Sequence, residues 1–183
     1  MPVAVADHGN AYMLAVLVAN SSTFRSVVSK ATVTKALTKI YYPWHDESGD
    51  NPELPSRAVI VDDSDFGDEN HRKVATGVWK ISGSYRLNFD FNIPATERTG
   101  RANEFAWFHK QTNNIMKEMR SIAGWGNSGV TSGDGNPLAH FNMMNYQRQE
   151  GPWEIDPSED MLPDPQTGDL LPFWHIGYDI SYW

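Results

Sequence analysis

The residues best suited to hold a metal ion form one acidic run. Residues 62–69 read Asp-Asp-Ser-Asp-Phe-Gly-Asp-Glu, and carboxylate oxygens are the ligands that Ca²⁺ and Mg²⁺ prefer. The EF-hand pattern fails here, because with Gly67 at its sixth position Phe66 occupies the fifth and Lys73 the twelfth, where oxygen ligands are required. The run is therefore interpreted as an acidic hairpin tip, and no metal is expected.

Histidine and cysteine usage bears on catalysis. The chain has no cysteine, which excludes disulfides, thiolate catalysis and cysteine-ligated zinc. Its six histidines form neither H-x-x-x-H nor H-E-x-x-H, and no G-x-S-x-G motif marks a serine nucleophile. His175 and Asp179 share the polar face of a predicted strand, where a structural hydrogen bond is favoured over a catalytic dyad. We expect no catalytic residues.

One glycine-rich stretch matches the letters of a nucleotide-binding motif. Residues 124–129 match G-x-G-x-x-G, but that motif needs its glycines between a strand and the start of a helix. Here they follow the predicted C-terminus of a helix, whose dipole repels phosphate. Gly124 is better explained as a C-cap, and no cofactor is expected.

The elements that position these residues are clearest between residues 84 and 122. From Tyr85 to Ile93 every second residue is apolar, which predicts a strand with one buried face and a polar face that holds Asp90. Spacings of three and four then predict a helix over residues 102–123. The predicted core scaffold consists of Tyr85, Leu87, Phe89, Phe91, Phe105, Phe108, Ile115, Met119 and Ile122.

The rest of the chain completes an α+β pattern. A helix is predicted over residues 7–28, broken at Asn20-Ser21-Ser22, with Ser22 capping the second part and a further helical turn over residues 32–37. Further strands are predicted over residues 40–42, 57–61, 73–82, 138–149 and 173–183, with Gly83 at a hairpin or bulge. The prediction is one domain, residues 1–183, with one mainly antiparallel β-sheet, a long helix packed on one face and an N-terminal helix. Residues 151–172 form a proline-rich excursion.

The net charge and the hydropathy of the chain restrict the kinds of partner that it is expected to bind. The formal net charge of −8, with no basic block, argues against general affinity for nucleic acid. The longest apolar run, residues 11–19, is shorter than the ~20 residues that span a bilayer. Residues 1–3 lack the basic start of a signal peptide, so we expect a soluble protein that is not secreted by the usual route.

In size and element order the chain resembles the tail-terminator (tail-completion, minor tail) proteins of long-tailed bacteriophages and phage-like particles. The likeness is carried by the N-terminal helix with residues 20–25, strand 40–42, the strand pair around Gly83, helix 102–123 and strand 174–180. The resemblance implies a non-enzymatic virion protein that forms a ring, typically of six copies. The excursion departs from a minimal version of that family and leaves open a different neck or tail component.

The resemblance also implies partners. A ring of this family caps the tail tube, faces the head-tail connector or stopper protein, and lets DNA pass through its lumen without specific binding. It would be assembled in the host cytoplasm and reside in the virion tail or neck, away from membranes. The candidate subunit-interface residues are Asp62, Asp63, Asp65, Phe66, Trp125 and Trp153. The last two are tryptophans of predicted loops, which equally suit the alternative of a small carbohydrate-binding module.

Overall fold

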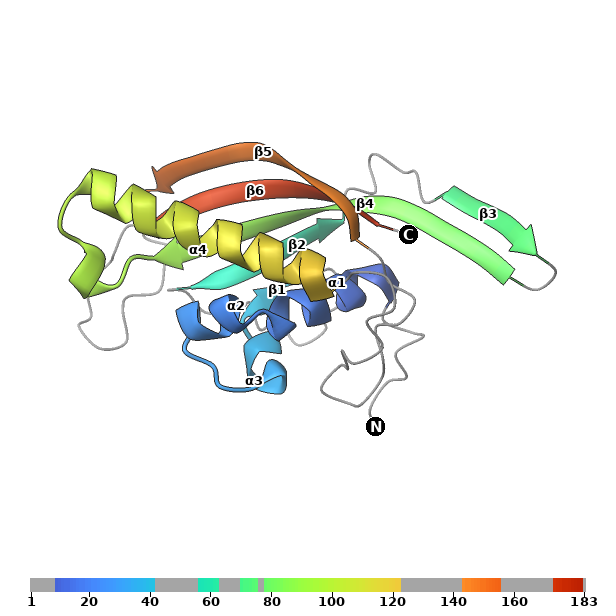
Figure 1. The fold of residues 1–183 in the computed structure, drawn as a ribbon, viewed down its shortest axis with the longest axis horizontal. Coiled ribbons are helices and arrows are strands. Elements are labelled where there is room, and N and C mark those ends of the chain that lie inside the picture. Colours follow the sequence, from blue (N-terminus) through green and yellow to red (C-terminus); the bar gives the residue numbers. More distant parts are fainter. Residues whose placement is uncertain are drawn as a thin grey trace.

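The computed structural model describes residues 9–41, 56–62, 70–75, 78–122, 143–155 and 173–182 of the chain (Figure 1). Four helices, one short 3₁₀ turn and six strands lie in these segments. Their bounds are α1 (Gly9–Asn20), α2 (Ser22–Val27), α3 (Val33–Leu37), β1 (Ile40–Tyr41), β2 (Arg57–Asp62), β3 (Asn70–Ala75), β4 (Val78–Asn92), η4 (Ala95–Glu97), α4 (Arg101–Ile122), β5 (Met143–Ile155) and β6 (Phe173–Tyr182). The predicted α+β class is confirmed.

The sheet is mainly antiparallel, as predicted. Its strand order is β1-β2-β4-β6-β5, and β3 pairs with β4 outside this path. Among the strands that the structure describes, only β1 and β2 pair in parallel. β4 and β6 form the centre, where Phe89 lies opposite Ile176. The two strands with the clearest alternation in the sequence therefore pair with each other.

The apolar face of this sheet, called the inner face, packs against the helices. Figure 1 shows α4 running across the sheet, with α1, α2 and α3 beside it. Phe108 of α4 meets Phe91 edge to face, with ring centroids 5.8 Å apart. Phe24 of α2 lies 6.3 Å from the Phe89 ring. The core therefore lies between one sheet face and the helices, and each of the four described helices contributes buried residues to it.

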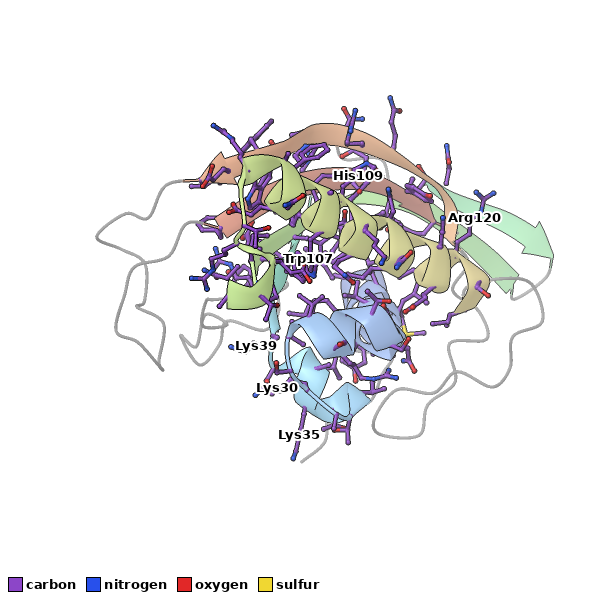
Figure 2. The ribbon with its side chains drawn as sticks, turned by 60° about the vertical axis from the view of Figure 1, so that its left-hand side comes forward. Lys30, Lys35, Lys39, Trp107, His109 and Arg120 are labelled. Carbon is purple, nitrogen blue, oxygen red and sulfur yellow. The ribbon has the colours of Figure 1, made fainter. Side chains whose placement is uncertain are left out.

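The predicted core scaffold holds with one correction, at Phe105. The other members are buried, apart from Ile122, which is partly buried and packed against the core. Phe105 is 42% exposed; it lies near the start of α4, where its ring packs against that of Trp174 with centroids 5.8 Å apart. Met116 is fully buried although it lies outside the predicted stripe. Trp107 on the same helix packs partly against the core (Figure 2).

The predicted break in the N-terminal helix is present, but its cap is one residue earlier. Ser21, not Ser22, is the N-cap of α2, and its hydroxyl accepts a hydrogen bond from the Phe24 amide at 3.0 Å. Across the break, Arg25 donates to the carbonyls of Ala19 and Asn20. These carbonyls lie at the end of α1, where a cation is favourable. The break is therefore a hydrogen-bonded corner between two helices.

Glu118 of the long helix α4 binds the same corner through hydrogen bonds. Its Oε2 accepts from the Ser21 hydroxyl at 2.7 Å and the Thr23 amide at 3.1 Å. Its Oε1 accepts from the hydroxyls of Thr23 at 2.6 Å and Ser22 at 3.1 Å. Partial burial raises the pKa of Glu118, but the hydrogen bonds from Thr23, Ser21 and Ser22 outweigh it, so the pKa lies below its ordinary value.

Replacing Glu118 by glutamine should therefore destabilise the protein. The glutamine side chain keeps one acceptor oxygen, but its NH₂ group faces hydroxyls and a backbone amide that already donate hydrogen bonds. We therefore expect the free energy of unfolding to fall by about 1–2 kcal/mol. Because the folded pKa is lowered, this contribution is present above the ordinary pKa and is lost as pH falls through the folded value. Urea titrations at neutral and acidic pH measure both effects. Glu97→Gln, on the short turn η4 outside this corner, is the control.

The strands around Gly83 differ from the prediction. Residues 73–82 were expected to form one strand ending at a hairpin or bulge, but they belong to two strands, β3 and β4, and β4 continues through Gly83. Gly83 lies opposite Tyr182, and a Cβ there would approach the tyrosine hydroxyl to 2.6 Å. This glycine is therefore required by close packing inside a strand.

β3 and the start of β4 form an arm that extends past the body of the sheet. β4 is 15 residues long, and β6 pairs with it only from Gly83 onward. Residues 78–82 pair with β3, in a register that sets Asn70 opposite Ser82. Figure 1 shows this two-stranded ribbon projecting from the molecule. We call β3 together with residues 78–82 the arm.

Candidate functional site

A row of charged side chains crosses the outer face of the sheet, the face opposite the helices. Strand register sets Arg57 of β2 opposite Asp90 of β4, and Asp90 opposite His175 of β6. Arg57 Nε lies 3.0 Å from Asp90 Oδ2, and His175 Nδ1 lies 2.7 Å from Asp90 Oδ1. His175 Nε2 lies 3.3 Å from Glu150 Oε1 of β5. We call Arg57, Asp90, His175 and Glu150 the charge row.

A change of register in β5 brings Glu150 and Trp153 to the same face. Glu150 pairs with Gly177 and Trp153 with His175, so three steps along β5 match two steps along β6. Residues three apart in a regular strand point to opposite faces, and the extra residue of a bulge corrects this. Gly151 lies in the irregular stretch with φ of +71°, where a Cβ would clash with the His175 carbonyl oxygen.

Gly177 leaves room for Glu150 to reach the histidine. A Cβ at Gly177 would lie 2.6 Å from Glu150 Cγ and 2.8 Å from Asn88 Oδ1. The Glu150 side chain therefore lies directly over the β6 backbone. Asn88 Oδ1 is buried there, and among the residues that the structure describes it has no hydrogen-bond partner. A side chain at residue 177 would displace Glu150 from His175.

Both nitrogens of His175 face carboxylates, so the protonated imidazole, which donates at both nitrogens, is the form that satisfies both contacts. Burial lowers the pKa of His175, but the hydrogen bonds and charges of Asp90 and Glu150 outweigh it and raise the pKa above its ordinary value. The Trp153 ring stacks on the imidazole, with centroids 5.6 Å apart and planes at 24°. An aromatic face adds to the stabilisation of a cation.

This geometry favours a structural function for the row. In the doubly hydrogen-bonded state His175 has no lone pair with which to accept a proton, so it cannot act as a general base there. The charges alternate in sign across four neighbouring strands, from Arg57 on β2 to Glu150 on β5. Each opposite-charge pair across two strands stabilises one register over its alternatives. The row therefore fixes the alignment of the sheet.

The predicted pairing of His175 with Asp179 is wrong. Asp179 instead pairs with Arg86 of β4, with Arg86 Nε 3.2 Å from its Oδ1. Four residues along a strand separate two Cα atoms by about 13 Å, whereas neighbours on adjacent strands lie about 5 Å apart. Cross-strand partners therefore take precedence over partners on the same strand.

The structure places only some of the predicted interface residues. Asp62 ends β2, opposite Tyr85 of β4. Trp153 lies on strand β5, not in a loop, and is 45% exposed. Asp63, Asp65, Phe66 and Trp125 lie outside the described residues, as do the Gly124 motif and most of the proline-rich excursion. Residues 151–155, the start of that excursion, belong to β5.

The described segments hold neither a metal-binding group of side chains nor a membrane-spanning helix. Among them, no three His, Asp or Glu side chains are grouped in a way that could hold a metal ion. In the same segments no helix has the length and apolar character needed to cross a membrane.

Sequence reasoning missed three of the four residues of the charge row as site residues. The alternating pattern does place Asp90 and His175 on polar strand faces. Arg57 opens a predicted strand, and Glu150 falls between the strand predicted over residues 138–149 and the excursion predicted over residues 151–172. The row depends on contacts between residues far apart in the chain: Arg57 and Asp90 are 33 positions apart, and Asp90 and His175 are 85 positions apart. No local pattern carries that information.

The fold and the site together define an α+β protein with an inner face covered by helices, a charge row on its outer face and a projecting two-stranded arm. No protein-family model matches the chain, and no curated protein matches its sequence.

Proposed function

We propose that the protein is a non-enzymatic structural subunit of a phage or phage-like particle. Copies of it form a ring, of six subunits by the resemblance, that terminates the tail tube and joins it to the head-neck connector. DNA passes through the lumen of this ring without specific binding. In this proposal the protein resides in the virion tail or neck.

The arm is the observation that carries the proposal. Along residues 78–82, β4 pairs with β3, while the other neighbours of β4 in the sheet begin at Gly83 or later. A two-stranded ribbon is marginally stable by itself in water, so a protein that maintains one benefits from a surface on which to lay it. A neighbouring subunit supplies that surface in a ring, where each copy contacts the next through two different patches.

Other features support the same proposal. The charge row holds four strands in a fixed register, which suits a rigid ring subunit. When it is protonated, His175 donates to Asp90 and Glu150 and cannot accept a further proton as a general base. Trp153 leaves an aromatic surface at the rim of the outer face, as is common for residues that anchor protein interfaces.

Removing the arm tests the proposal. Asn70 and Ser82 lie directly opposite each other, so residues 71–81 can be replaced by an Asn-Gly turn that closes the shortened hairpin. The described core residues all lie outside this segment, so the variant should keep its secondary structure and cooperative unfolding. Native mass spectrometry and negative-stain images should show closed rings for the full chain and monomers for the variant. Rings that persist without the arm would contradict its role.

A carbohydrate-binding module is the second candidate, and the exposure of Trp153 is the observation that favours it. That function predicts a monomer whose tryptophan fluorescence changes on addition of oligosaccharide. Such a response, with Trp153→Ala abolishing it and no ring at any concentration, would replace the ring proposal.

A further inference from the structure

The charged residues are distributed unevenly along the chain. All fifteen Lys and Arg residues fall in the ranges that the structure describes, together with eight of the twenty-three Asp and Glu residues. These ranges are therefore basic in composition, although the formal net charge of the whole chain is −8. The charge of the whole chain thus does not predict what an individual surface of this protein attracts.

The basic excess is greatest in residues 9–41, the segment that contains α1, α2 and α3. This segment has no Asp or Glu and holds four cations, Arg25, Lys30, Lys35 and Lys39. Arg25 donates to the carbonyls at the end of α1 and is occupied within the corner. Figure 2 shows the three lysines along one side of this helical segment, remote from Arg120 of α4. We call Lys30, Lys35 and Lys39 the lysine face.

Backbone hydrogen bonds fix the position of the lysine face in the fold. The Lys30 amide donates to a carbonyl of α2 at 2.9 Å. Thr32 caps α3, and its hydroxyl accepts from the Lys35 amide at 3.2 Å. The Lys39 carbonyl accepts from the amide of Ala58 on β2 at 3.0 Å. The three lysines therefore belong to a framework that is joined to the sheet.

Two lysines of this face are available to a partner. Among the described residues, no ion pair involves Lys30 or Lys35. Lys35 is exposed and Lys30 is half-buried. The other exposed residues of the stretch 26–38 are small, and most carry a hydroxyl group: Ser26, Ser29, Ala31, Thr32, Thr34 and Thr38. The exposed surface around the two lysines therefore combines positive charge with hydroxyl groups and has no carboxylate of its own.

This composition favours nucleic-acid phosphate over a protein surface as the partner. Lysine side chains and Ser and Thr hydroxyls are common ligands of the DNA backbone. Protein interfaces are instead enriched in aromatic residues, Met and Arg, and depleted in Lys and Ser. No aromatic side chain is exposed in residues 26–38, so unpaired bases have nothing to stack on. The same stretch exposes no Arg, Asn or Gln, the side chains that read base edges. A duplex, bound through its backbone, is therefore the favoured partner.

We propose that the lysine face contacts the phosphate backbone of duplex DNA without reading its sequence. The inference rests on the proposed ring function, because it names the surface of each subunit that faces the passing DNA. Few cations per copy make each contact weak and sensitive to salt. The DNA can therefore slide, while the ring repeats the contact around it.

Reversing the charge of the lysine face tests the contact. Fluorescence anisotropy of a labelled duplex of about 30 base pairs measures binding by the full chain between about 20 and 150 mM NaCl. Lys30→Glu with Lys35→Glu should weaken binding at least about tenfold at the low end of this range. Duplexes of unrelated sequence should bind wild type within about twofold of one another. A wild-type chain that binds no duplex at the lowest salt concentration would overturn the proposal.

Lys30→Gln with Lys35→Gln removes the two cations without adding repulsion. Because each phosphate contact contributes about 0.9 to the slope of log K against log salt, the slope should become shallower by about two. Circular dichroism checks that the helices are retained in both double variants. A slope equal to that of wild type would show that these lysines do not contact phosphate and would overturn the proposal.

The matched control is Lys110→Glu with Lys117→Glu, which changes the net charge by the same amount as the reversal of the lysine face. Both lysines are exposed on α4, and Figure 2 shows that helix across the molecule from the lysine face. Binding should remain within about threefold of wild type, because salt screens distant charges. An equal loss in the control would show that net charge governs binding, and would overturn the proposal.

A carboxylate polymer distinguishes an acidic protein partner from DNA. Polyglutamate, added at the same concentration of charges as the duplex, should displace little of the bound duplex. Displacement as effective as that by unlabelled duplex would assign the lysine face to an acidic protein surface and would overturn the proposal.

Failure of the DNA contact and failure of the ring function give different results. Closed rings that bind no duplex would overturn the contact and leave the ring function. A chain that binds duplex through the lysine face but stays monomeric at every concentration, with and without DNA, would support the contact and contradict the ring.

Discussion

Replacing Asp90 by asparagine is expected to lower the free energy of unfolding by about 3 kcal/mol. The Asp90 side chain is 7% exposed and lies between two cations, with Arg57 Nε at 3.0 Å and His175 Nδ1 at 2.7 Å. Removing one partner of a buried ion pair leaves the others uncompensated, which costs more than the intact pair contributes. Urea unfolding followed by tryptophan fluorescence measures the loss.

Asp179→Asn is the matched control for this prediction. Asp179 lies on the same outer face and also pairs with an arginine of β4, but its side chain is 30% exposed and that of Arg86 is 35% exposed. A pair screened by solvent in this way contributes less than about 1 kcal/mol. Equal losses in the two variants would show that burial of the charge row does not set its energy.

Asp90→Asn should also change how the free energy of unfolding depends on pH. Because His175 has a raised pKa in the folded state, its contribution is fully present below the ordinary pKa of 6.5 and is lost as pH rises through the folded value. Asp90→Asn removes the stronger of its two carboxylate partners. The stability difference between wild type and variant should therefore narrow as pH rises above about 6.5. A difference that stays constant as pH rises would contradict a contribution from the titration of His175.

Phe89→Ala should cost about 4 kcal/mol, the largest effect we expect in the core. Phe89 is fully buried, and its ring lies 5.4 Å from that of Phe91 and 6.3 Å from those of Phe24 and Tyr178. The substitution therefore opens a cavity where β4, β6 and α2 meet. The more conservative Phe89→Leu should cost less than half as much, which keeps the measurement possible if the alanine variant is too unstable to study.

Phe105→Ala is the control for the core prediction. Both phenylalanines belong to the periodic patterns of the sequence, yet Phe105 is 42% exposed and Phe89 is not exposed at all. Truncating Phe105 loses its contacts with His109 and Trp174 but leaves no enclosed cavity, so a loss below about 1 kcal/mol is expected. Denaturant titration of both variants compares them directly. Losses of similar size would mean that the start of α4 is covered by another part of the assembly.

Local periodicity determined which residues face the core. The alternation from Tyr85 to Ile93 and in β6 assigned the buried and polar faces correctly, because a strand turns successive side chains to opposite sides whatever lies beside it. The spacing of α4 identified its buried residues for the same reason, except for Phe105 near the start of the helix, which is 42% exposed.

Strand boundaries were predicted less well, because they depend on pairing. Gly83 is the clearest case: a glycine in a β-rich stretch is typical of a turn or bulge, but here it accommodates the Tyr182 hydroxyl inside a long strand. In β5, Pro152 was interpreted as the start of an irregular segment. The strand instead continues through a bulge to Ile155.

The sequence by itself determined the α+β class, the antiparallel centre of the sheet and the polar faces that hold Asp90 and His175. Only the tertiary structure decided that these two residues meet, that Arg57 and Glu150 join them, and that β3 and β4 form a projecting arm. The physical reason is the separation along the chain of the residues that interact. Periodicity reflects the geometry of a single element, whereas register joins residues far apart in the chain and is set by the packing of the whole sheet.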